Sequence, residues 1–90
     1  MAKLFKIDGT IETVELRDAA HMNELIGDWW LADDVKHRHA LVTDDTAIAK
    51  AKPVNANASA LIGREVRGNA VWILRSKMHR AILGMSASGN

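Results

Sequence analysis

The chain has 90 residues, a formal net charge of +1, one proline and no cysteine. This length fits one domain, and an apolar fraction of 48% is too high for a disordered chain. The absence of cysteine excludes disulfides, Cys-ligated zinc and thiol catalysis. The longest apolar run, Ala70 to Leu74, is far too short for a membrane helix, and the first residues contain no secretory signal. We therefore expect a soluble cytoplasmic protein that makes no membrane contact.

The near-neutral net charge conceals an uneven distribution along the chain. Residues 8–45 carry a net charge of −7, whereas residues 64–90 carry +4. A basic C-terminal part is able to contact phosphate groups, although the same charges also suit a solvated surface.

Residues 3–16 are predicted to form a β-hairpin, because Asp8-Gly9 is a strong signal for a two-residue turn. In that register Phe5, Ile7, Val14 and Leu16 share one apolar face.

Residues 18–27 are predicted to form a short helix with Asp18 as its N-cap and Gly27 just beyond its end. Its apolar stripe, which includes Met22 and Ile26, would pack on the hairpin.

The second half of the chain contains further predicted strands. Residues 40–43 form a strand, residues 46–49 a short return strand, and residues 55–61 a single helical turn. Residues 66–75 form the best strand, which is apolar on both faces at its centre and therefore belongs in the middle of a covered sheet. We expect a single α+β domain over residues 1–75, followed over residues 76–90 by a short helix and a flexible tail.

This order predicts a β-grasp-like (ubiquitin-like) fold. An N-terminal hairpin is followed by one helix that packs on a small mixed sheet, and the last apolar strand lies centrally, parallel to the first. The analogy concerns topology alone and implies no function.

Four short patterns together resemble a known family. They are Leu25-Ile26-Gly27, Leu41-Val42 followed by Asp44-Asp45, Pro53-Val54-Asn55, and the stretch from Arg67 to Ile73. The set resembles the DUF3846 family of small proteins from bacteriophages and bacterial mobile elements, over roughly residues 3–75. Asn69 stands where that family often has Asp. The family has no assigned activity, so the resemblance implies only a phage or mobile-element accessory protein, of a kind that often disables a host factor.

Trp29 and Trp30 are the first candidates for partner contact. Adjacent residues of an extended segment point to opposite faces, so one ring should pack while the other is at least partly exposed. Met78 and Ile82 on the C-terminal helix are further candidates, unless that helix docks on its own sheet.

The basic C-terminal part supplies an alternative, a nucleic-acid-binding surface. That surface would consist of Arg64, Arg67, Arg75, Lys77 and Arg80. A third alternative is an oligomer that sequesters a small ligand.

Other polar residues give weaker signals. Asn55 suits either a helix cap or a ligand contact. His37 and His39 lack a fixed third metal ligand, and the pairs Asp33-Asp34 and Asp44-Asp45 suit solvated turns as well as catalysis. We therefore expect no metal, no cofactor and no enzymatic activity, and the leading hypothesis is a protein that binds a host protein, with a homo-oligomer as an alternative assembly.

Overall fold

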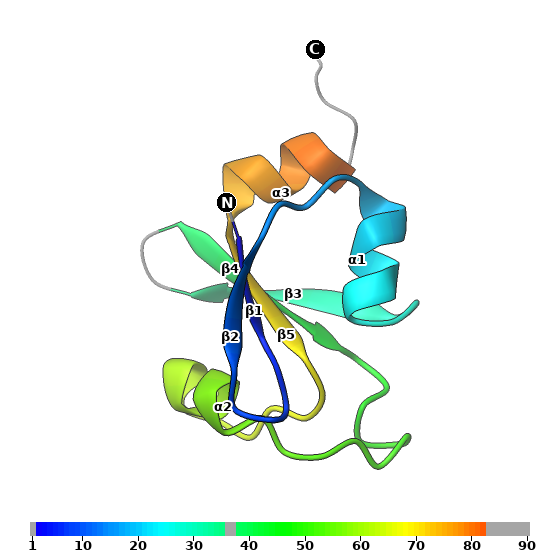
Figure 1. Ribbon diagram of the computed structural model, residues 1–90, viewed down its shortest axis with the longest axis vertical. Helices are drawn as coiled ribbons and strands as arrows, with labels where there is room; N and C mark the ends of the chain where they lie inside the picture. The colour runs from blue at the N-terminus through cyan, green and yellow to red at the C-terminus, as the bar shows by residue number, and fades with distance from the viewer. Residues whose placement is uncertain (1, 36–37, 83–90) are drawn as a thin grey trace.

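A computed structural model describes residues 2–35 and 38–82 of the chain. They form an α+β fold with one five-stranded antiparallel sheet, in the order β2-β1-β5-β4-β3. The strands are β1 (Ala2–Phe5), β2 (Ile11–Val14), β3 (Trp30–Val35), β4 (His39–Asp44) and β5 (Ala70–Leu74). The helices are α1 (Ala19–Leu25), α2 (Ala56–Ile62) and α3 (Arg75–Ile82) (Figure 1).

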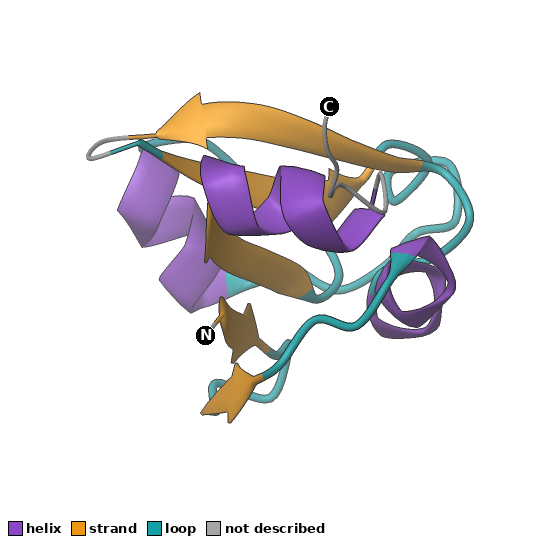
Figure 2. Ribbon diagram, turned by 90° about the horizontal axis from the view of Figure 1, so that it is seen from above, coloured by secondary structure: helices purple, strands orange, loops and turns teal. Residues whose placement is uncertain are grey.

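The sheet is covered on both faces, and Figure 2 shows α1 and α2 on opposite sides of it. On one face, Met22 of α1, Ile26 at the end of α1 and Met78 of α3 pack against Val42 and Val71. On the other face, the α2 side, a second cluster forms. It consists of Phe5, Leu41, Ala58, Val66 and Ala70. Alternate residues of β4 and β5 enter different clusters, which explains why the centre of each strand is apolar on both faces.

The central position of β5 and the N-terminal hairpin agree with the prediction from the sequence, but the parallel pairing of a β-grasp fold is wrong. β5 runs antiparallel to β1, with Leu4 opposite Val71, so the sheet is not mixed. The reason lies in residues 45–69, which leave β4 and enter β5 at the same end of the sheet (Figure 1). Because β5 starts at the end of the sheet where β4 stops, β5 runs antiparallel to β4.

The register of the hairpin also differs from the prediction by one residue. The amide of Gly9 donates to the carbonyl of Lys6, and the amide of Lys6 donates to the carbonyl of Thr10, so the loop has three residues. Gly9 has φ +92°, as a type I turn followed by a bulge requires. Phe5 consequently pairs with Ile11, and Val14 pairs with Ala2. Val14 and Leu16 therefore pack with Ala2 and Leu4 (rather than with Phe5 and Ile7), because a shift of one residue exchanges the faces.

The helices agree in part with their predicted bounds. Asp18 caps α1 as expected, and its carboxylate accepts a hydrogen bond from the amide of His21. The helix expected from Ser76 begins one residue earlier, so the boundary drawn between residues 75 and 76 falls within α3, which packs on the sheet. The return strand expected over 46–49 is wrong, because residues 45–51 form turns. Residues 36–37 and residues 83–90, which include the predicted tail, lie outside the described part of the chain.

Candidate functional site

The two neighbouring tryptophans lie in different environments, as the sequence predicts. Trp30 packs against the core, and its Nε1 donates a 2.9 Å hydrogen bond to Oδ1 of Asn23 on α1. Trp29 is 67% exposed. One ring is therefore structural, whereas the other is available on the surface.

Trp29 is held against the turn that follows β4. Its carbonyl accepts a 2.7 Å hydrogen bond from the amide of Asp45, which continues the β3–β4 pairing by one residue. Because side chains alternate along a paired strand, this places Trp29 on the side of Leu31, away from Trp30.

Two further apolar side chains are exposed in this region. Ile48, in the turn, is 80% exposed, and Leu31 of β3 is 47% exposed. Both line a cavity of about 170 Å³, to which Trp29 does not contribute. We call Trp29, Leu31 and Ile48 together the Trp29 surface.

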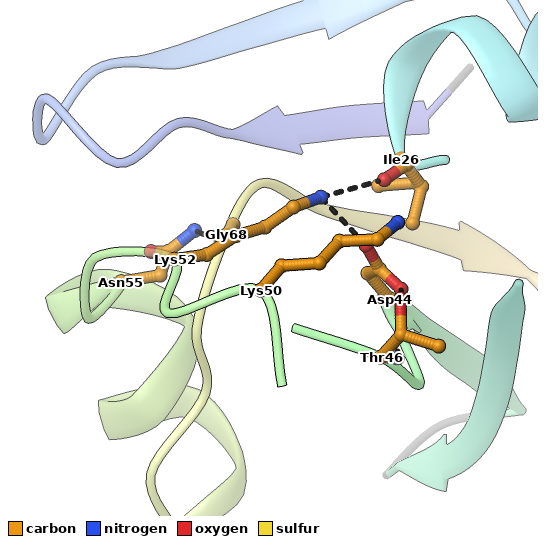
Figure 3. Close-up of polar contacts among 7 residues, drawn as sticks. All are labelled: Ile26, Asp44, Thr46, Lys50, Lys52, Asn55 and Gly68. Atoms are coloured by element: carbon orange, nitrogen blue, oxygen red, sulfur yellow. Dashed lines mark hydrogen bonds and ion pairs between the residues drawn. The ribbon is translucent and has the colours of Figure 1, made fainter. Parts of the chain in front are cut away.

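Ion pairs between the buried carboxylate of Asp44 and two partly exposed lysines fix the turn that carries Ile48. Oδ2 of Asp44 lies 2.6 Å from Nζ of Lys52 and 3.3 Å from Nζ of Lys50, and the Asp44 side chain has no exposed area. Lys52 also donates to the carbonyl of Ile26 at 3.3 Å (Figure 3). Lys52 thus ties the end of α1, the end of β4 and the turn together.

The protonation of Asp44 follows from these contacts. Burial alone would raise the pKa of its carboxyl, but hydrogen bonds from Lys52, from Thr46 and from Lys50 outweigh burial and hold the pKa well below its ordinary value. Thr46 contributes both its amide, at 2.8 Å, and its hydroxyl, at 2.7 Å. Asp44 is therefore a charged structural anchor.

Asn55 is fully buried and has a capping role, one of its two predicted roles. Its Oδ1 accepts from the amide of Ala58 at the start of α2, and its Nδ2 donates to the carbonyls of Phe5 and Gly68 at 2.8 and 2.9 Å. Both amide hydrogens are used in these contacts, so Asn55 joins α2 to β1 and to the segment before β5.

The predicted contact residues of the C-terminal helix lie against the protein itself. Met78 is only 8% exposed and belongs to the core, and Ile82 packs against the same cluster. Helix α3 therefore docks on its own sheet, and the expected patch of Met78 and Ile82 does not form an open surface.

Three of the five basic residues predicted to bind nucleic acid have acidic partners. Arg64 pairs with Asp33, Arg75 with Asp34, and Arg67 with Glu65. Two of these acids come from the acidic first half of the chain, so the fold pairs part of the basic C-terminal charge with it. Lys77 and Arg80 make no ion pair with any residue of the described ranges 2–35 and 38–82.

The histidine and acidic candidates are dispersed. The ring of His39 stacks on Trp72, with ring centres 4.1 Å apart, whereas His37 lies outside the described residues. Asp33 and Asp34 belong to β3, not to a loop. Among the described residues, no three His, Asp or Glu side chains form a group suited to a metal ion.

Sequence reasoning missed Leu31, Ile48 and the Lys52–Asp44 pair. Leu31 and Ile48 look like core residues in the sequence, and only their positions on the edge strand and in a turn expose them. Asp44 and Asp45 follow an apolar strand, and two adjacent acids at the end of a strand are typical of a solvated turn. The sequence does contain a signal for the Lys52–Asp44 pair, namely a polar residue at the end of a buried strand and a lysine eight residues later. This signal is not specific.

No protein-family model, curated protein sequence or solved structure matches the chain. Among the helices of the described part, none is long and apolar enough to cross a membrane.

Proposed function

We propose that this chain is a non-enzymatic protein-binding module whose contact region is the Trp29 surface. The observation that carries the proposal is the exposure of three apolar side chains: Trp29 just before β3, Leu31 within β3, and Ile48 on the turn after β4, which the Asp44–Lys52 ion pair fixes. Tryptophan is enriched among the residues that dominate binding energy, and a rigid support reduces the entropy lost on binding.

The position of this surface in the sheet adds support. β3 is an edge strand, and its outer backbone groups are open to pairing with an extended segment of another chain. Asp33 and Asp34 place charges on the second half of β3, which disfavours unspecific pairing there, whereas the half next to Trp29 is apolar.

The resemblance of residues 3–75 to the DUF3846 family supports a biological setting for the proposal. In that setting the chain is a phage or mobile-element accessory protein in the bacterial cytoplasm, and it binds and modulates a host factor, with host defence systems among the candidates. The nucleic-acid alternative is weakened by the ion pairs of Arg64, Arg67 and Arg75.

Affinity capture from a bacterial lysate tests the proposal when it includes a matched control. Trp29→Ser and Ile48→Ser remove exposed apolar groups from the Trp29 surface. Ile11→Ser removes a 50% exposed side chain from β2, at the opposite edge of the sheet.

We expect a saturable partner that Ile11→Ser retains and that Trp29→Ser loses. Retention of the same partner by all three variants would refute the role of the surface. If the partner is a second copy of the chain, sedimentation will show a dimer that Trp29→Ser dissociates.

A further inference from the structure

A cavity at the other end of the molecule lies between α3 and the chain that leaves β2. Its volume is about 390 Å³, within the range of small-molecule sites. Arg17, Lys77 and Arg80 line it, together with the apolar Leu16 and Ile73 and one acidic residue, Glu15. The cavity thus combines three cationic groups with a small apolar contribution from Leu16.

The charges of this cavity are poorly compensated. Lys77 and Arg80 have no ion-pair partner in the described part of the chain. Arg17 has only a distant contact with Glu24, 3.9 Å apart, and both side chains are largely exposed. An anion placed among the three cations would relieve their mutual repulsion and gain charge-assisted hydrogen bonds.

We propose that this cavity binds a small phosphate monoester, with its phosphate on Arg17, Lys77 and Arg80 and its organic part on Leu16. A dianionic phosphate matches several cations, and guanidinium groups bind phosphate oxygens bidentately. The half-buried side chain of Leu16 supplies an apolar contact for a carbon skeleton, whereas Ile73 is buried in the core.

The surroundings favour a small ligand over a nucleic acid. A nucleic acid requires a continuous track of cations along its backbone, because its affinity grows with the number of phosphates contacted. Beyond the cavity, Arg64, Arg67 and Arg75 are each paired with an acid. Of the five basic residues predicted to bind nucleic acid, the two without an acidic partner, Lys77 and Arg80, therefore both lie at this cavity.

Titration with phenyl phosphate, monitored by the backbone amide NMR spectrum of the full chain, tests this site. We expect saturable shifts at Arg17, Lys77 and Arg80, with affinity higher than for inorganic phosphate and no shifts with phenol. Inorganic phosphate alone binding as tightly as phenyl phosphate would overturn the assigned apolar contact.

Arg80→Ala should weaken binding by about tenfold or more, since it removes a charged hydrogen-bond donor to the phosphate. Lys3→Ala is the matched control, because it removes one exposed charge from a residue that does not line the cavity. Urea unfolding of both variants checks that the fold is retained. Equal affinity in Arg80→Ala, or the absence of saturation in the millimolar range, would refute the site.

The competing hypothesis is that the same cations bind a nucleic acid, and a single-stranded oligonucleotide without a terminal phosphate tests it. Tighter binding of this oligonucleotide than of phenyl phosphate, with an affinity that falls steeply as salt rises, would overturn the small-ligand assignment.

Discussion

Nζ of Lys52 lies 2.6 Å from Oδ2 of Asp44, whose side chain is completely buried. The same ammonium group donates to the carbonyl of Ile26 at the end of α1. Gly27 follows directly, and a Cβ atom there would lie 3.2 Å from Oδ2 of Asp44. The chain thus closes tightly around this ion pair, and the turn carrying Ile48 is built on it.

Replacing Lys52 with Met should destabilise the fold by about 2–3 kcal/mol, because a buried carboxylate loses its nearest cation. The loss stays below the full cost of an unpaired charge, since Thr46 and Lys50 still contact Asp44. Urea unfolding measures this effect. Lys50→Met is the control and should cost about 0–1 kcal/mol, because that lysine is half exposed and farther away. Equal effects of the two substitutions would contradict the assigned anchor.

The lowered pKa of Asp44 predicts that stability depends on pH. In the folded state the carboxyl has a pKa below 3.8, its ordinary value, so unfolding takes up a proton at low pH. This contribution is complete above the ordinary value and is lost as the pH falls through it toward the folded pKa. Urea unfolding between about pH 7 and pH 3 should therefore show a smaller difference between wild type and Asp44→Asn at the acidic end. A difference that is constant over this range would exclude Asp44 as the source.

Asn55 provides a prediction that separates its two functions. Asn55→Ala should cost about 2–4 kcal/mol, because it removes the cap of α2 and leaves the carbonyls of Phe5 and Gly68 without a donor. Asn55→Asp keeps the cap but turns a buried carboxylate oxygen toward both carbonyls. We expect the Asp variant to be the less stable of the two near neutral pH, as thermal and urea unfolding would show. The reverse order would mean that capping alone accounts for the residue.

Gly68 and Gly9 form a matched pair for a steric test. Both have positive φ, +79° and +92°, so alanine is strained at either position by about 1–2 kcal/mol. At Gly9 an added Cβ meets nothing within 4 Å, whereas at Gly68 it would lie 2.9 Å from Cδ of Lys52. That side chain is held at its far end by Asp44 and cannot move away freely. Gly68→Ala should therefore destabilise clearly more than Gly9→Ala in chemical denaturation, and similar losses would contradict the packing of Lys52 on Gly68.

In the hairpin, local sequence signals predict the turn but not the register of the two strands. Asp8-Gly9 predicts the turn correctly but not its length, because the Asp8 carboxylate accepts from both the amide and the hydroxyl of Thr10 and favours a three-residue loop. One additional residue in the loop then reverses which apolar residues face α1 and α3. Patterns with a period of two predict a strand well, but they predict its face only when the register is known.

The capping residues Asp18 and Asn55 were predictable because a cap is a contact between near neighbours in the chain. The direction of β5 relative to β1, the Lys52–Ile26 contact and the Asp33–Arg64 pair were not, because each joins segments far apart in sequence. The exposure of Leu31 and Ile48 has the same origin, since only the strand order makes β3 an edge. Of the three residues of the Trp29 surface, the sequence therefore predicted only Trp29, as a member of the tryptophan pair.

Photo-crosslinking in bacterial cells shows whether a partner protein contacts the Trp29 surface. A benzophenone amino acid replaces Trp29 in one protein and Ile11 in another, so that both probes occupy exposed apolar positions at opposite edges of the sheet. We expect a discrete crosslinked protein adduct from position 29 and none from position 11. The absence of an adduct at position 29, or the same adducts from both positions, would contradict this expectation.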